Sequence, residues 1–406
     1  TAAPQHGTTL LISTVSHSIK RTLQQRTDRW FLLAVFALAA TSVFTVFSAS
    51  AFLVETKMGG ASDAFLVRQV IRVGAALLVM GVVSLIDYRW LARFSLAFLL
   101  IALGLLVAVQ IAGQTSGGAQ RWLDFGGVSL QPSDLAKVAL IFHVAKLLAQ
   151  KQPYIREFAR AYVPLLVWIG PTLLLIGMDD LSTALIVFCA VGAMCLIGRV
   201  PLLHLSGTGV LVLVCAFAFL ASSEERAKRL EAYLGVKIFN HTEEAEVFDR
   251  QGEGYQAHQA RIAVAMGGLT GVGPGKSVQR DFLPAPYNDF IFAIIAEEYG
   301  LVGATILLAL FFVLLFRGFM RIARGAPDPF GLFLASGLTT ALVLYGFVNA
   351  GVASGLLPVT GLPMPFVSYG GSSTLATGLM VGLLLNIARH AGTTPNASLA
   401  KRRGGR

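Results

Sequence analysis

Residues 289–316 read DFIFAIIAEEYGLVGATILLALFFVLLF and decide the class of fold. After Glu298 the stretch holds no charged residue, and a helix needs about 20 mostly apolar residues to span a membrane. The whole chain is similar, with 55% hydrophobic residues, 13% charged residues and a mean hydropathy of +0.69. Soluble domains carry about 25% charged residues. The composition therefore excludes an ordinary soluble enzyme, a disordered chain and a disulfide scaffold, and it predicts an all-α integral membrane protein.

Ten segments are apolar enough to be predicted as membrane-spanning helices. They are 30–54, 70–86, 91–112, 135–149, 161–178, 181–198, 203–222, 289–316, 330–352 and 368–388. Segment 135–149 is short, and segment 70–86 carries Arg72 near its start. A signal peptide is an alternative for the first segment, but its apolar run is too long for one. An even number of spans places both termini on the same side of the membrane.

The distribution of Lys and Arg predicts the orientation. These residues concentrate on the side of the termini, whereas the short loops of the other side hold only Lys57, Arg68 and Arg121. Cytoplasmic loops of membrane proteins collect Lys and Arg, so we expect both termini in the cytoplasm. The expected organisation is a basic tail at 1–29, a membrane domain at 30–390 with a large outer loop at 223–285, and a basic tail at 391–406. The net charge of +10 then reflects orientation and not binding of nucleic acid.

Two features that could suggest ligands are rejected. The three cysteines all lie in apolar runs without a neighbouring His or carboxylate, which is typical of small buried hydrophobic residues and not of a metal site. The run from Gly271 to Ser277 resembles a phosphate-binding loop, but that motif requires Gly where this chain has Thr270. We therefore predict neither a metal site nor a nucleotide site from these residues.

The end of the outer loop, residues 255–266, is predicted to form a short amphipathic helix. Ile262 and Met266 fall on one face of it. Three polar residues are then available to solvent or ligand: Gln256, Gln259 and Arg261. A run rich in Gly and Pro follows, from Gly267 to Gly275.

Asp289 opens the long apolar segment at its outer end. It could serve as an N-cap, because Asp accepts hydrogen bonds from the first free N–H groups of a helix. It is also a candidate functional residue, because ionisable groups at the edge of a span are costly and are kept for function. Glu297 and Glu298 lie about 12 Å deeper, at 1.5 Å per residue. We expect them to pair with charges on other helices.

Charged residues from separate segments are predicted to gather at the outer membrane surface. They are Arg68, Arg121, Asp134, Lys137, Asp180, Arg229 and Asp289. Asp134 and Lys137 are three residues apart and can form an ion pair on one helix face. The gathering favours one outward-facing cavity, in which cations suit a phosphate-bearing lipid and a carboxylate suits a general base. Asn349 and the loop from Leu357 to Ser373, with its repeated Pro and Gly, complete this outer side.

Several of these motifs occur in fixed order, and the chain resembles the SEDS family, which comprises RodA, FtsW and SpoVE. The resemblance runs from about Arg29 to Arg389. It rests on Arg121-Trp122, Gln131-Pro132-Ser133, Asp180-Leu181 with Thr183, Asp289-Phe290-Ile291-Phe292, Glu297-Glu298, and Pro358 to Ser373. Gly273 to Arg280 and Pro286 to Gly300 look more like the division-type FtsW members.

The resemblance implies a ten-span peptidoglycan glycosyltransferase that polymerises lipid II into β-1,4-linked glycan strands on the outer face of the bacterial cytoplasmic (inner) membrane. Asp289 matches the essential aspartate of the family, and we assign it the role of general base. Substrate-binding roles are expected for Arg68, Arg121, Asp134, Lys137, Asp180, Arg229, Gln256, Gln259, Ser368 and Ser372. The implied partners are a class B penicillin-binding protein and other divisome or elongasome membrane proteins. A divalent cation could assist departure of the pyrophosphate, although no ligand set is recognisable.

Two departures from the family pattern concern the site. Asp134 stands where the family usually has Glu, and Ser182 and Asp179 replace a usual Gly and Pro beside Asp180. Two other functions remain open. A transporter that flips lipid II would need a polar path through the membrane, of which Glu297 and Glu298 are the only visible start. A non-catalytic scaffold for the transpeptidase would need no catalytic carboxylate.

Overall fold

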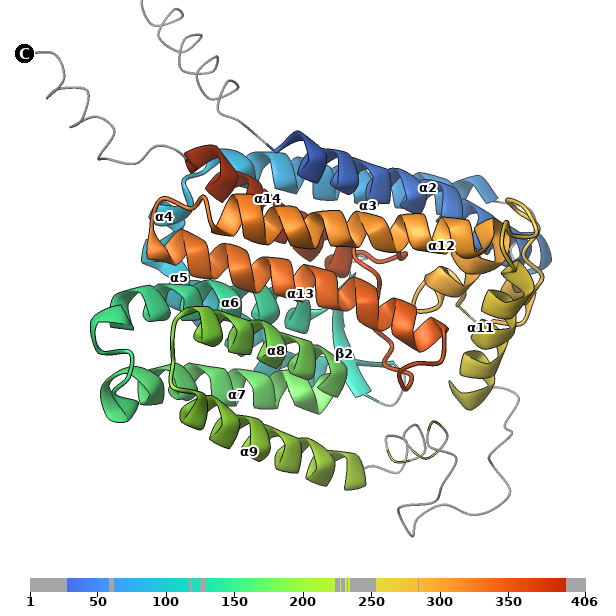
Figure 1. Ribbon diagram of the computed structural model, residues 1–406. Helices are drawn as coiled ribbons and strands as arrows, with labels where there is room; N and C mark the ends of the chain where they lie inside the picture. The colour runs from blue at the N-terminus through green and yellow to red at the C-terminus, as the bar shows by residue number, and fades with distance from the viewer. Residues whose placement is uncertain are drawn as a thin grey trace, which may run out of the picture.

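The structure is a computed structural model in which the chain forms one elongated helical bundle (Figure 1). It describes residues 28–391 apart from 58–61, 117–118, 125–128, 223–226, 228–230, 232, 234–252 and 284. Figure 1 shows the long helices running side by side, with α11 at the end of the bundle opposite α4.

The bundle consists of helices of very different lengths. The first half of the chain contributes α2 (Arg29–Lys57), α3 (Ser62–Leu85), α4 (Tyr88–Leu91), η1 (Ala92–Phe94), α5 (Ser95–Ala112), α6 (Pro132–Lys151), η2 (Gln152–Tyr154), η3 (Phe158–Tyr162), α7 (Val163–Asp179) and α8 (Leu181–Ile197). The second half contributes α9 (Leu202–Ala221), α11 (Glu253–Gly267), η5 (Gln279–Asp281), α12 (Ile291–Arg317), η6 (Gly318–Ala323), α13 (Pro329–Ala353) and α14 (Ser372–His390).

Each of the ten predicted segments overlaps one of these helices, and α6 begins at Pro132, before the start of the predicted segment 135–149. Among the described residues, 7 helices are long and apolar enough to cross a membrane. α8 is as apolar but shorter. The prediction of an α-helical, multi-pass membrane protein is therefore confirmed. The number of ten crossings and the cytoplasmic side of the termini stay predictions.

One part of the chain departs from the all-helical expectation. The connection between α5 and α6 forms a small antiparallel sheet of β1 (Gln114–Ser116), β2 (Ala119–Asp124) and β3 (Ser129–Leu130), in the order β1-β2-β3. The hydropathy of the sequence did not predict it, because such short strands have too few residues for an alternating pattern to emerge. The sheet places Arg121 beside the end of α7.

Burial distinguishes the centre of the bundle from its edge. Most residues of α13 are buried, and this helix packs against α6, α8, α12 and α14. α9, in contrast, has no buried residue and lies along one edge of the bundle (Figure 1). Its apolar residues therefore face lipid, because apolar surface of this extent is stable only inside the bilayer.

The amphipathic helix predicted at 255–266 is confirmed as α11, but its buried face is different. Met266 is 46% exposed, whereas Ala260 and Ala263 are fully buried. The reason is the close approach of α11 to α12: a Cβ atom on Gly267 would lie 1.9 Å from the backbone oxygen of Ala296. Small residues permit this contact, so size rather than hydrophobicity selects the inward face.

The hydrogen-bond ladder of α12 is interrupted at Gly300, whose φ of 65° and ψ of −164° are not helical. The N–H groups of Leu301 and Val302 donate to the carbonyls of Gly268 and Leu269, at 2.9 and 3.2 Å. In return, the carbonyls of residues 297 and 298 accept from the N–H groups of residues 272 and 273, at 2.9 and 3.0 Å. Hydrogen bonds with the loop after α11 thus replace two hydrogen bonds within α12.

Gly300→Ala is expected to destabilise the protein by at least about 2 kcal/mol. A non-glycine residue is strained at this φ and ψ, and the added Cβ would lie 2.4 Å from the backbone nitrogen of Gly271. Thermal unfolding of the purified variant in detergent measures the loss. Gly104→Ala in α5 is the matched control, because a Cβ there meets nothing within 4 Å. Equal melting temperatures for the two variants would contradict the prediction.

Candidate active site

Asp289 lies in a turn directly before α12 and is half-buried. The N-cap position of α12 is occupied by Phe290, so the interpretation of Asp289 as the helix N-cap is wrong. The backbone reason is that residues 285–290 form turns and the helix begins at Ile291. The Asp289 carboxylate faces the loop between α13 and α14: its Oδ2 is 3.6 Å from the position that a Cβ atom of Gly361 would take.

Asn349 of α13 joins this turn to the loop between α13 and α14. Its Nδ2 donates to the backbone oxygens of Asp289 and Leu362, both at 2.8 Å. The side chain is 1% exposed. An amide with two carbonyl acceptors can only present its NH2 group to them, so the orientation of Asn349 is fixed.

Two further contacts hold the same turn. Ser368 Oγ donates to the backbone oxygen of Asn288 at 2.7 Å and accepts from the N–H of Met364 at 2.8 Å. The N–H of Tyr369 donates to the oxygen of Tyr287 at 2.8 Å. Burial, together with the neighbouring Tyr369, raises the pKa of Tyr287. These contacts are made to main-chain atoms of the turn. They therefore fix the position of Asp289 without bonding its carboxylate.

The predicted ion pair between Asp134 and Lys137 is present, with 2.7 Å between Oδ1 and Nζ. Both side chains are buried. Ser372 Oγ donates to the other Asp134 oxygen at 2.7 Å. The Lys137 ammonium lies 4.3 Å from the centre of the Tyr345 ring, an arrangement in which the ring face attracts the cation.

The chain of polar contacts continues from Tyr345 to Asp180. The Tyr345 hydroxyl donates to Thr183 Oγ1 at 3.2 Å, and Thr183 Oγ1 donates to Asp180 Oδ2 at 2.8 Å. Asp180 also caps α8 by accepting from the N–H groups of Ser182 and Thr183. The replacement of the family's usual Gly by Ser182 therefore leaves this cap intact. α6, α8, α13 and α14 are tied together in this way.

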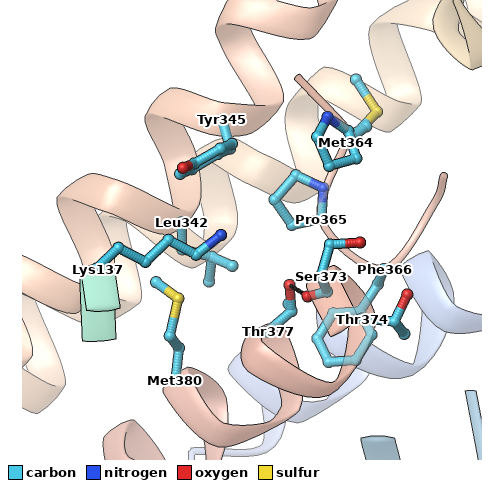
Figure 2. Close-up of a pocket in the computed structure, with 11 residues that line it drawn as sticks. Lys137, Leu342, Tyr345, Met364, Pro365, Phe366, Ser373, Thr374, Thr377 and Met380 are labelled. Atoms are coloured by element: carbon cyan, nitrogen blue, oxygen red, sulfur yellow. Dashed lines mark hydrogen bonds between the residues drawn. The ribbon is translucent and has the colours of Figure 1, made fainter. Parts of the chain in front are cut away.

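A small pocket opens beside Lys137. Figure 2 shows the Lys137 side chain reaching under the Tyr345 ring, with Pro365 and Ser373 across the pocket. Its volume of about 10 Å³ is room for about one water molecule. Lys137 is therefore engaged with Asp134 and shielded from the outer surface, and direct contact with a substrate would require the pair to open.

The remaining predicted residues are more dispersed. Arg121 Nε donates to the backbone oxygen of Asp179 at 2.9 Å, and the Asp179 carboxylate accepts from Gln110. Arg68 is exposed on α3, and Gln256 and Gln259 are half-buried on α11. Arg229 lies outside the described residues. The substrate-binding roles of these residues stay predictions.

The hydrogen bonds of Glu297 and Glu298 come from hydroxyl and N–H groups, and the charge of Arg280 in η5 also acts on Glu298. Glu297 accepts from the Ser277 hydroxyl and from the N–H of Val278, the latter at 2.9 Å. Glu298 accepts from the Ser48 hydroxyl. Glu297 is 0% and Glu298 1% exposed. Glu297 anchors the loop after α11 to α12, and its buried carboxylate, bonded to N–H and O–H groups, needs no ion pair. Glu298 joins α12 to α2.

Sequence reasoning missed Tyr345 as part of the site. A single tyrosine in an apolar helix gives no signal that it faces a lysine two hundred residues earlier in the chain. Asn349 was visible as a polar residue near the loop, but its bond to Asp289 was not. Among the described residues, no group of three or more His, Cys, Asp or Glu side chains comes together. The structure therefore offers no ligand set for a divalent cation within those residues.

Comparison with known proteins shows which family and which relatives the chain is similar to. The profile of the cell cycle protein family of FtsW, RodA and SpoVE matches residues 29–393. Stage V sporulation protein E of Bacillus subtilis (strain 168) is 36% identical over 368 residues, which cover 90% of this chain and 97% of that protein. A probable peptidoglycan glycosyltransferase FtsW of Geobacter metallireducens is 37% identical over 375 residues, covering 91% and 97%.

A solved structure supports the fold. A chain from a study of how a peptidoglycan synthase complex coordinates polymerisation and crosslinking superimposes with a TM-score of 0.73 at 27% identity. The match covers 90% of this chain and 98% of that chain.

Proposed function

The chain belongs to the FtsW, RodA and SpoVE family of cell cycle proteins, and from this premise we propose that it is a peptidoglycan glycosyltransferase. Its substrate is lipid II, a disaccharide peptide carried on undecaprenyl pyrophosphate. It joins these units into β-1,4-linked glycan strands at the outer face of the cytoplasmic membrane, during cell division or shape maintenance.

The observation that carries this proposal is the setting of Asp289. Its carboxylate lies at the end of a membrane helix, half-buried, on a turn whose backbone is held by Asn349 and Ser368. A general base must be held within reach of the proton that it removes. A carboxylate on a fixed turn meets this requirement, whereas a purely structural scaffold needs no such arrangement.

Asp289 accepts the proton of the 4-hydroxyl of the acceptor N-acetylglucosamine as that oxygen attacks the anomeric carbon of the growing strand. A carbon–oxygen bond forms, and the bond from the anomeric carbon to the pyrophosphate oxygen breaks. Undecaprenyl pyrophosphate leaves with the bonding electron pair. Because attack and departure are in line, the α-linked pyrophosphate becomes a β-glycoside.

The leaving pyrophosphate carries negative charge that cations can stabilise. Lys137 is paired with buried Asp134, so Arg121 and Arg229 are the better candidates for this role among the predicted cations. We assign Asp134, Lys137, Asp180 and Ser372 to holding the four helices around the site.

We propose that the chain lies in the inner membrane of a bacterium. Its proposed partner there is a class B penicillin-binding protein that cross-links the product. The support is the similarity to a chain of a peptidoglycan synthase complex. Other divisome or elongasome membrane proteins would assemble with the pair.

The test supplies the purified chain, together with a candidate transpeptidase, with fluorescent lipid II in detergent. Glycan strands that are resolved on a gel and digested by lysozyme support the proposal. The same protein in liposomes is then assayed for transfer of lipid II between leaflets. Transfer without any polymer would favour the transporter, and neither activity would favour the scaffold.

Asn349→Leu is expected to lower kcat for polymerisation about 10- to 100-fold while KM for lipid II changes little. The variant removes the hydrogen bond to the Asp289 carbonyl and the hydrogen bond to the Leu362 carbonyl, which together tie the turn to the loop between α13 and α14. A displacement of about 1 Å in a catalytic group can cost 10²-fold. Steady-state kinetics measure both constants. Ser354→Ala is the control, because Ser354 at the end of the same helix bonds only that helix. An unchanged kcat in Asn349→Leu would refute the positioning role.

A further inference from the structure

Two buried polar side chains of the first two long helices take no part in the contacts described so far. Ser42 lies in α2 and Gln69 in α3, and both are 0% exposed. A buried polar group without a hydrogen bond is costly, so the protein has to supply each of them with a partner. Their hydrogen bonds lead to the loop between α13 and α14.

The Ser42 hydroxyl joins α2 to this loop. It donates to the backbone oxygen of Val367 at 3.0 Å and accepts from Gln69 Nε2 at 2.7 Å. A hydroxyl has one proton, and a carbonyl oxygen can only accept. The Ser42 proton is therefore directed to Val367, and Gln69 has to present its NH2 group to Ser42. Hydrogen bonds thus run from α3 through α2 to the main chain of the loop.

The residue before Val367 has an unusual backbone conformation. Phe366 has a φ of 61°, and its side chain is 1% exposed. A bulky residue is strained in this region, and such a conformation persists only where the surrounding structure holds it. Within the loop, the carbonyl of Met364 accepts from the N–H groups of Val367 and Ser368, at 3.1 and 3.0 Å. From outside the loop, Ser42 fixes the peptide that joins Val367 to Ser368.

That peptide leads directly to the Asp289 turn. Ser368 is 2% exposed, and its Oγ donates to the backbone oxygen of Asn288 at 2.7 Å. Asn288 immediately precedes Asp289 in the chain. A displacement of the peptide between Val367 and Ser368 would therefore be passed through this bond to the position of the Asp289 carboxylate.

We propose that Ser42 is a positioning residue for Asp289 and that Gln69 orients the Ser42 hydroxyl for this role. The two side chains hold the strained loop in the conformation in which Ser368 reaches Asn288. Both are fully buried, so they act through the loop and not by contact with the substrate. This role rests on the proposed glycosyltransferase function, in which the Asp289 carboxylate is the general base.

Four variants separate positioning from stability. Ser42→Ala removes the bond to Val367 and takes the acceptor away from the Gln69 NH2 group. Ser42→Ala combined with Gln69→Met removes both polar groups, and such a paired apolar replacement can be nearly neutral for stability. Ser42→Thr keeps the hydroxyl. Ser336→Ala is the control, because Ser336 is also 0% exposed and its hydroxyl donates to the carbonyl of Leu332 in its own helix.

Polymerisation of fluorescent lipid II gives kcat and KM for each variant, and thermal unfolding in detergent gives the melting temperature. We expect Ser42→Ala to lower the melting temperature and to lower kcat about tenfold with KM nearly unchanged, because small displacements of a catalytic group are costly. The double variant should regain the melting temperature but not kcat. Ser42→Thr should keep more of kcat than Ser42→Ala does, and Ser336→Ala should match the parent in kcat.

Two kinetic results would overturn the positioning role. One is a kcat of Ser42→Ala equal to that of the parent. The other is a double variant that regains kcat together with the melting temperature, since Ser42 would then act on stability alone. Failure of the proposed function itself has a different signature, because the parent chain would then form no polymer.

A second measurement does not depend on polymerisation. Hydrogen–deuterium exchange reports local opening of the main chain. It should be faster at residues 364–369 and 287–291 in the double variant than in the parent, and unchanged in Ser336→Ala. Equal exchange of these residues in the double variant and the parent would show that Ser42 does not hold the loop or the Asp289 turn.

Discussion

Asp289→Asn is expected to lower kcat for lipid II polymerisation by about 10²- to 10⁴-fold, which is the usual contribution of a general base. The substitution removes the proton acceptor and keeps the shape of the side chain. The contacts of the turn made by Asn349 and Ser368 use main-chain atoms and persist. The melting temperature and the affinity for lipid II should therefore remain close to those of the parent. Initial rates with fluorescent lipid II measure the effect.

Two controls sharpen this experiment. Asp281→Asn removes a carboxylate from the same outer segment, beside Arg280, and should leave the rate unchanged. Asp289→Glu keeps the base but displaces it by one methylene, and partial activity is expected. Polymer formed by Asp289→Asn at the parent rate would exclude Asp289 as the base, whatever the function of the rest of the site.

Lys137→Met is expected to destabilise the protein by about 3–5 kcal/mol, the cost of removing one partner from a buried ion pair. Asp134 would keep the hydrogen bond from Ser372 and lose its countercharge in an environment where it is only 5% exposed. Tyr345 would lose the cation beneath its ring. Thermal and denaturant unfolding in detergent measure the change.

The double variant Asp134→Leu with Lys137→Met is the matched control. Replacement of a buried ion pair by apolar side chains of similar volume is often neutral or stabilising, so the double variant should recover most of the loss. If the double variant were less stable than Lys137→Met alone, the pair would not be the source of the effect. Melting temperatures of the two variants, compared side by side, decide between these outcomes.

Hydropathy was sufficient to locate the helices, because each long apolar run has a single stable conformation in lipid. Segment 135–149 looked weak since α6 carries Asp134 and Lys137 in its first turns, and the partners that permit their burial come from α13 and α14. The strands β1 to β3 were missed because they are short. The prediction of the inward face of α11 was wrong, because Gly267 and two alanines, and not the larger side chains, make the contact with α12.

The contacts of the candidate site were predictable where they join residues that are close together in the sequence. Asp134 and Lys137 are three residues apart, so their pairing follows from helix geometry. The contacts of Asn349 with Asp289, and of Tyr345 with Lys137, join helices that are distant in sequence. No pattern within one segment encodes them. Glu297 was expected to meet a charge, yet hydroxyl and N–H groups of the outer loop satisfy it, and the sequence of α12 alone does not indicate this.

The exchange of hydrogen bonds between α12 and the loop after α11 has a consequence for biogenesis. The N–H groups of Leu301 and Val302 depend on the carbonyls of Gly268 and Leu269. An unpaired N–H inside the hydrocarbon costs several kcal/mol. During synthesis the loop emerges before α12, so it has to be in place when that helix enters the bilayer. Placement of the preceding segment and insertion of α12 are thereby coupled into one step of assembly.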